Sequence, residues 1–156
     1  MASSIHNQPS AIELLRALAA RAKMLGLKGR TAMTLNFVKG SQAWFAKVGM
    51  IEIYLPDHAG ELDRDQVRVA EEIEQNLPSL QLRASSYLDR FVDRAKACGK
   101  DEEPWWLEEV EFRASAPVPR YYISFTLDGD DGGMWSVEML VNNGEHRPVG
   151  FERRQG

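Results

Sequence analysis

Cysteine, long apolar runs and targeting segments are scarce or missing in this sequence. Its 156 residues contain one cysteine, Cys98, so no disulfide can form within the chain. No stretch of about 18 apolar residues occurs, and the first residues lack the basic and apolar regions of a signal peptide. These absences favour a protein of the reducing cytoplasm with no membrane partner.

Signatures of common chemistry are missing as well. The chain contains no GxxxxGK[ST] loop, no GxGxxG segment after a strand and no GxSxG motif. Histidine occurs only at His6, His58 and His146, never at the i, i+4 spacing of zinc ligands. Cys98 falls at the expected C-terminal end of a helix, where the helix dipole opposes thiolate formation. We therefore expect no cofactor, and the sequence leans away from catalysis without excluding it.

Basic residues are fewer than acidic ones, and the two kinds are segregated along the chain. Nineteen Lys and Arg against 23 Asp and Glu give a net charge of −4, which disfavours nucleic acid as a partner. Residues 11–47 hold seven basic side chains and one acidic, whereas 56–76 hold seven acidic and two basic and 101–113 hold six acidic and one basic. Solvated faces of helices and strands are the simplest explanation. If the two acidic stretches share a surface, it would instead steer a basic protein partner.

Helical periodicity appears in three segments. Residues 1–9 are polar and predict a flexible arm, after which an S-x-x-E capping box and an apolar stripe predict a helix over 10–26. Two further helices are predicted over about 63–76 and 78–98, separated by a proline that a first helical turn tolerates.

Alternation with period two predicts the strands. They fall at residues 31–38, 43–55, 105–114, 121–127, 135–141 and 149–151. No β-α-β alternation is visible, so the expected fold class is α+β, with a mainly antiparallel sheet of five to six strands and about three helices packed on one face. A single domain over 10–156 accounts for these elements, with a sub-boundary near 99–104 as the alternative.

The Asn143-Gly144 turn raises a question of register. If the apolar sets of both flanking strands face the core, directly paired residue numbers must sum to an even number. A two-residue turn would pair Asn142 with Glu145, an odd sum. We therefore expect a three-residue loop from Asn142 to Gly144, with Gly144 in the left-handed conformation.

The stretch 128–133, Asp-Gly-Asp-Asp-Gly-Gly, is the sharpest local motif. It departs from a calcium loop because position 5 is Gly132 and position 12 is Met139. A glycine-rich hairpin turn with solvated aspartates is the main interpretation. The alternative is a weak divalent-metal site made by Asp128, Asp130, Asp131 and His146.

Aromatic residues offer candidate anchors for a partner. The rings that the inferred core faces do not account for are Trp44, Tyr54, Trp105 and Tyr122. Trp105 and Trp106 are adjacent in a predicted strand, so one indole must lie on each face, and Trp106 shares the parity of the apolar set. Packing at a sheet edge or under a helix is the plain interpretation, and exposure for a partner is the functional one.

The C-terminal run from Trp106 to Phe151 combines an aromatic strand, the aspartate-rich turn, the Gly-Met-Trp start of the next strand and the Asn143-Gly144 turn. In these features, which cover about a third of the chain, it resembles small bacterial domains of unknown function, some of which are immunity proteins that bind and neutralise polymorphic toxins. The resemblance implies a protein-binding role and assigns no functional residue.

The leading hypothesis is a non-enzymatic bacterial binding protein, in one version an immunity protein or inhibitor, that occludes a basic protein partner. Its acidic surface and aromatic anchor would comprise Asp57, Glu61, Asp63, Asp65, Glu71, Glu72, Glu74, Glu108, Glu109, Glu111 and Trp105. One alternative is a ligand-binding domain or small enzyme with a pocket between sheet and helices, using His58, the three aspartates of the turn and His146. The other is a homodimer built on the edge strand 31–38 or on the aromatic surface.

Overall fold

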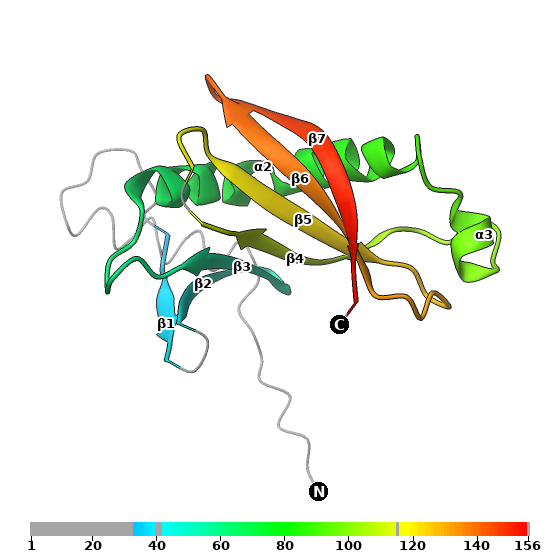
Figure 1. The fold of residues 1–156 in the computed structure, drawn as a ribbon, viewed down its shortest axis with the longest axis horizontal. Helices are drawn as coiled ribbons and strands as arrows, with labels where there is room; N and C mark the ends of the chain where they lie inside the picture. The colour runs from blue at the N-terminus through cyan, green and yellow to red at the C-terminus, as the bar shows by residue number, and fades with distance from the viewer. Residues whose placement is uncertain (1–32, 40–41, 115, 156) are drawn as a thin grey trace, which may run out of the picture.

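The computed structural model describes residues 33–39, 42–114 and 116–155, which form one seven-stranded sheet (Figure 1). The strands are β1 (Asn36–Val38), β2 (Ala43–Val48), β3 (Ile51–Pro56), β4 (Trp106–Phe112), β5 (Arg120–Thr126), β6 (Met134–Asn142) and β7 (Glu145–Arg154), and the helices are α2 (Arg64–Leu88) and α3 (Arg94–Cys98). α2 lies across one face of the sheet. The predicted arm 1–9 and helix 10–26 lie outside the described residues.

The strands follow one another in the sheet in chain order, and one neighbouring pair is parallel. Every other pair is antiparallel, but β3 and β4 run in the same direction, with Ile53 opposite Val110. The chain leaves β3, crosses the sheet as α2 and returns beside β3 as β4. Parallel neighbours need such a crossover because a tight turn cannot join them.

This architecture corrects the sequence-based fold. An α+β protein with a sheet dominated by antiparallel pairing is confirmed, but the sheet is mixed and has seven strands, and the described residues hold two helices, one of them long. The extra strand arises because the predicted strand over 43–55 is broken by a turn at Gly49, which adopts a left-handed backbone. The sequence pattern did not predict the parallel crossover, because the two predicted helices follow each other without a strand between them.

The long helix α2 begins at its predicted start and joins two predicted helices. Asp63 caps its N-terminus by accepting hydrogen bonds from two first-turn amides. The backbone departs from helical geometry at Asn76 because Pro78 has no amide hydrogen and its ring crowds the preceding turn. After this kink the helix continues to Leu88, where it stops, and α3 is a separate short helix.

A single apolar layer lies between α2 and the sheet. Its fully buried members include Ile53, Leu55, Val69, Ile73, Ala84, Leu88, Val110, Tyr121, Ile123, Phe125, Val137 and Met139. Burial of one large apolar side chain contributes roughly 1.5–3 kcal/mol. This layer therefore fixes which strand positions face α2 and which face the opposite side.

The β6–β7 hairpin has the turn that the parity argument rejects. Asn142 pairs directly with Glu145, so the loop contains two residues rather than three. Asn143 and Gly144 both have positive φ, as a tight turn of type I′ requires. The expected three-residue loop is therefore wrong.

The parity is restored further along β7 by a bulge at Val149. On the turn side of the bulge, His146 lies opposite Val141 and faces the core. Beyond it, Phe151 lies opposite Val137, as the apolar pattern predicts. An extra residue in one strand reverses the alternation of side chains. As a result, a histidine occupies an interior position that the pattern assigns to the surface.

A second bulge, between Leu107 and Glu109, reverses the start of β4. Leu107 therefore faces the core instead of Trp106, which is 55 % exposed. Trp105 is 7 % exposed and donates its indole N–H to Asp89. The predicted roles of the two indoles are thus interchanged, and the exposed anchor is Trp106.

The candidate boundary near 99–104 is the connection between α3 and β4. Arg94 donates a hydrogen bond to the carbonyl oxygen of Glu103, and Lys100 pairs with Asp128 in the turn before β6. These contacts fasten the connection to α3 on one side and to the sheet on the other. In the described part of the chain, no helix combines the length and apolar character needed to cross a membrane.

Candidate functional site on the open face of the sheet

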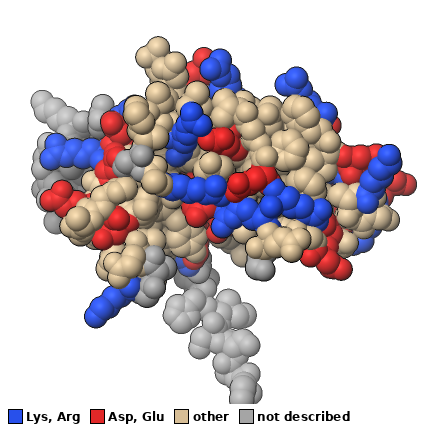
Figure 2. Space-filling view, viewed as in Figure 1, with Lys and Arg blue, Asp and Glu red and all other residues tan. Residues whose placement is uncertain are grey.

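The open face is the side of the sheet turned away from α2, and charged and aromatic side chains line it. They alternate with core residues because successive side chains of a strand point to opposite faces. Figure 2 shows Lys and Arg lying beside Asp and Glu across this side of the molecule. Its charged and aromatic members include Lys47, Glu52, Tyr54, Trp106, Glu109, Glu111, Arg113, Tyr122, Glu138, Glu152 and Arg154.

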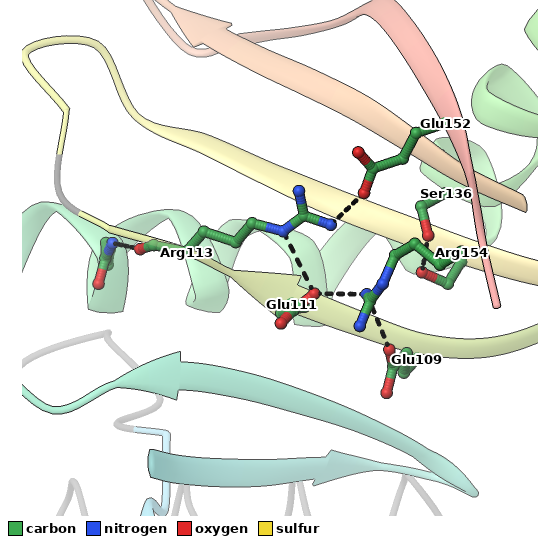
Figure 3. Close-up of polar contacts among 8 residues, drawn as sticks. Glu109, Glu111, Arg113, Ser136, Glu152 and Arg154 are labelled. Atoms are coloured by element: carbon green, nitrogen blue, oxygen red, sulfur yellow. Dashed lines mark hydrogen bonds and ion pairs between the residues drawn. The ribbon is translucent and has the colours of Figure 1, made fainter. Parts of the chain in front are cut away.

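Ion pairs connect the strands of the open face (Figure 3). Arg154 donates to Glu111 at 2.7 Å and lies 3.5 Å from Glu109. Arg113 pairs with both Glu111 and Glu152. Each exposed pair contributes only about 0–1 kcal/mol to stability. Their effect is mainly to hold long side chains in defined positions.

Two serines form the floor beneath these ion pairs. Ser124 of β5 lies directly opposite Ser136 of β6, and their hydroxyl oxygens are 2.7 Å apart. Both residues are fully buried, although they belong to the face without α2. Because each hydroxyl bonds to the other, neither is left unsatisfied.

Negative charge is concentrated where β3 and β4 meet. Glu52 lies directly opposite Glu109, and Glu111 lies two residues further along β4. Burial raises the pKa of Glu109, and the carboxylates of Glu111, Glu108 and Glu52 raise it further, against the opposing effect of Arg154. Lys47 lies 3.5 Å from Glu52, so the four carboxylates of this part of the open face share three cations, Lys47, Arg113 and Arg154.

Aromatic rings stand among these charges. A hydrogen bond to Glu52, reinforced by burial, raises the pKa of Tyr54 to about 12. The guanidinium of Arg113 lies 3.6 Å from the ring centre of Tyr122, a cation–π contact. With Trp106 exposed at the start of β4, the face combines carboxylates with large rings.

The acidic residues predicted to form one surface fall into two sets. Glu108, Glu109 and Glu111 belong to β4 and the open face. The other members lie in α2 or in the segment just before it: Asp57, Glu61, Asp63, Asp65, Glu71, Glu72 and Glu74. Because α2 lies against the opposite side of the sheet, its acidic residues do not share a face with those of β4 (Figure 1).

Most of the helix-side acids take part in local structure. Asp57 accepts a hydrogen bond from the amide of Gly60, and Asp63 caps α2. Arg68 forms ion pairs on α2 with Asp65 and Glu72. These roles account for their position without a partner, so the open face is the stronger candidate surface.

In the aspartate-rich turn Asp128 and Asp131 are exposed to solvent, as predicted, whereas the carboxylate of Asp130 is withdrawn from it. Asp128 pairs with Lys100, and Asp130, whose side chain is 4 % exposed, pairs with Arg153. His146 lies on β7, beside the end of β6 that is far from this turn, so the four residues of the metal alternative do not meet. No group of three potential metal ligands occurs among the residues that the structure describes.

A cavity of about 620 Å³ lies where the kink of α2 meets the β6–β7 turn, and His146 forms part of its wall. The ring nitrogens of His146 lie 2.8 Å from the Tyr121 hydroxyl and 2.7 Å from a carboxylate oxygen of Glu72. Since the ionised carboxylate only accepts, Nε2 donates to it and a neutral ring accepts from Tyr121. Arg83 donates to the carbonyl oxygen of His146 at 2.7 Å.

The remaining candidates for chemistry occupy structural positions. The Cys98 thiol is buried and donates to the carbonyl oxygen of Arg94, which suits a small packed side chain rather than a nucleophile. His58 lies in the loop before α2, with Nε2 3.4 Å from the side-chain oxygen of Gln66. Neither lines the cavity at the kink of α2.

Comparisons with protein-family models, with curated proteins and with solved structures find no match to this chain. The candidate site therefore rests on geometry. Sequence reasoning named Tyr54 and Tyr122 as candidate anchors but missed Glu52, Arg113 and Arg154 as members of it. A signal was present, because Glu109, Glu111 and Arg113 recur at every second position and must share a strand face. Trp106 carried no such signal, since a bulge reverses its parity.

Proposed function

We propose that this chain is a non-enzymatic binding protein whose open face covers a basic protein partner. The supporting observation is that Glu52 lies directly opposite Glu109, with Glu108 and Glu111 close by. Like charges at opposed strand positions are destabilising. Lys47 and Arg154, each 3.5 Å from one of these two carboxylates, offset part of the repulsion, and a lysine or arginine of the partner seated between the carboxylates would relieve the rest.

Occlusion is the proposed mechanism. The carboxylates speed encounter with a basic surface, and rings such as Trp106 and Tyr54, once covered, slow dissociation. In the version favoured by the resemblance of the C-terminal run, the partner is a toxin and the chain is its immunity protein. The single cysteine agrees with action in the cytoplasm of a bacterium.

The test compares two double variants that remove the same charge from opposite sides of the molecule. Glu52→Gln/Glu109→Gln acts on the open face, and Glu71→Gln/Glu74→Gln acts on α2. Each protein is used to capture partners from the native host, and bound proteins are quantified by mass spectrometry at increasing salt. We expect a basic protein that wild type and the α2 variant retain, that the open-face variant loses, and whose binding weakens as salt rises.

Two results would count against this function. One is a partner lost by the α2 variant but kept by the open-face variant, which would move the interface to the helix side. The other is a well-folded protein that retains no basic partner at low salt. If a partner is recovered and is an enzyme, occlusion also predicts that one equivalent of this chain inhibits it.

A second candidate function is small-molecule binding in the cavity at the kink of α2. The observation that favours it is the buried His146, held between Tyr121 and Glu72, in the wall of a cavity whose lining is polar apart from Leu80 and Gly144. A thermal-shift screen with anionic, cationic and neutral metabolites tests it, because a ligand at 100 times its Kd stabilises by about 2.7 kcal/mol. Stabilisation that Arg83→Gln abolishes and Arg90→Gln preserves would support it. A screen in which no compound stabilises the protein would remove it.

A further inference from the structure

Three aromatic rings, which we call the ring shelf, form a contiguous group where the end of α2 meets β7. The ring centres of Tyr87 and Phe91 are 5.0 Å apart, those of Phe91 and Phe151 are 5.6 Å apart, and those of Tyr87 and Phe151 are 6.5 Å apart. Phe91 is 57 % exposed and Phe151 is 38 % exposed. Exposed rings that touch one another across two elements form an apolar patch, unlike an isolated surface side chain.

The ring shelf is connected to the core by further rings. Phe151 contacts Trp135, which contacts Trp105, which in turn contacts the fully buried Phe125. Rings anchored in this way lose little conformational freedom when a partner covers them. Rigid aromatic side chains next to arginines are the composition found at the centres of protein interfaces.

The shelf lies beside an open sheet edge. β7 is the last strand in the order of the sheet, and among the described residues it pairs with β6 alone. At such an edge every second residue directs its amide and carbonyl groups outward. Pro148 and the bulge at Val149 interrupt the first half of this edge, so the regular part is 150–154. Figure 1 shows β7 at the margin of the sheet with α2 passing behind it.

Uncommitted positive charge flanks the ring shelf. The Arg90 guanidinium lies 5.7 Å from the ring centre of Phe91, and no carboxylate of the described residues forms a salt bridge with it. By contrast, Arg153, which lies over Trp135, is engaged by Asp130. A segment placed here would meet the rings of the shelf and the guanidinium of Arg90.

We propose that the β7 edge at 150–154 accepts an extended segment of a partner protein, which carries apolar side chains onto the ring shelf and an acidic side chain toward Arg90. An added strand fits better than a helix because it satisfies the outward amides and carbonyls of β7 as well as covering the rings. Its alternate side chains point toward the α2 side and therefore onto Tyr87, Phe91 and Phe151. This surface is separate from the open face and does not depend on the function proposed for it.

The experiment is a selection from a displayed library of random dodecapeptides against the full chain, with counter-selection against Phe91→Ser. Leu82→Ser is the matched control, since Leu82 is 67 % exposed and belongs to none of the ring contacts that define the shelf. We expect enriched peptides with apolar residues at every second position and an acidic residue on the same side of the strand as the apolar ones. They should change the fluorescence of Trp135 and bind Phe91→Ser about tenfold or more weakly while binding Leu82→Ser as well as wild type.

Two further measurements separate strand addition from other modes of binding. Peptide binding should slow amide exchange within 150–154, because an added strand forms main-chain hydrogen bonds with these residues. N-methylation of alternate backbone positions of the peptide removes the donors of these hydrogen bonds and should therefore abolish binding. The proposal is overturned if no peptide is enriched, if enriched peptides bind Phe91→Ser as tightly as wild type, or if N-methylation has no effect. A dimer in sedimentation experiments that Phe91→Ser dissociates would also overturn it, because a second copy would then occupy the edge.

Discussion

The hydroxyl oxygen of Tyr121 lies 2.8 Å from Nδ1 of His146, and both residues are buried. On its other side the imidazole bonds to Glu72, so a continuous chain of hydrogen bonds links the sheet to α2. Burial raises the pKa of Tyr121, which keeps its hydroxyl protonated and able to donate. The pair is therefore a satisfied polar contact inside an apolar layer, where loss of one partner is expensive.

Removal of the Tyr121 hydroxyl tests this contact. Tyr121→Phe should lower the free energy of unfolding by about 1–3 kcal/mol, because His146 Nδ1 then lacks its donor. Urea denaturation measures the difference. Tyr87→Phe is the control, since among the described residues Tyr87 makes ring contacts only, and it should change stability by less than about 0.5 kcal/mol. Equal effects in the two variants would contradict the assignment.

Replacement of Glu109 should stabilise the protein at neutral pH. Burial and neighbouring carboxylates raise its pKa in the folded state, so stability falls as pH rises from the unfolded pKa through the folded one. Glu109→Gln removes this penalty and should gain up to about 1 kcal/mol above that range and nothing below it. Denaturation between acidic and neutral pH measures the gain. Glu138→Gln, which breaks the pair with Arg120, should show no gain, and a gain of equal size there would refute the explanation.

Tyr54 should ionise well above the ordinary range of tyrosine. Its hydrogen bond to Glu52, with burial, raises its pKa to about 12 against an ordinary value of 10.0. Spectrophotometric titration of tyrosinate absorbance should resolve this group, and Glu52→Gln should bring its pKa down toward 10.0. An unchanged titration curve in the variant would show that Glu52 is not the cause.

Asp130 should contribute stability that acid removes. Burial raises its pKa, but hydrogen bonds from the Trp135 indole and the Gly132 amide, together with Arg153, bring the pKa below its ordinary value. Its contribution is therefore complete above the unfolded pKa, about 3.9, and is lost as pH falls through the folded pKa. Asp130→Asn should cost about 1–3 kcal/mol at neutral pH and less in acid, as measured by thermal unfolding. Asp131→Asn in the same turn is the control, and a cost equal to that of Asp130→Asn would argue against a specific role.

Local patterns predicted the elements whose signals lie within a few residues. The start of α2 at the Asp63 cap and the strands from β4 to β6 follow from periodicity and turn residues alone. Pro78 correctly marked an interruption, although the interruption is a kink within α2 rather than a boundary between helices. These signals depend on sequence neighbours, which a pattern can read.

The features that were missed depend on contacts between distant segments. The bulges in β4 and β7 reverse the alternation of side chains, and no residue type in these strands predicts a bulge. Trp106 and His146 were therefore assigned to the wrong faces. The parallel pairing of β3 with β4 is set by how α2 packs, which strand patterns do not encode. For the same reason the two acidic stretches could not be placed relative to each other from the sequence.

The parallel neighbours β3 and β4 also bear on how the chain assembles during synthesis. Strands β4 to β7 can pair in succession through short connections, but the β4 side of β3 stays open until α2, α3 and β4 have left the ribosome. Pairing between such distant segments is slow, and an unpaired strand edge invites association with other chains. We therefore expect the nascent chain to need a chaperone most when β1–β3 have left the ribosome and β4 has not.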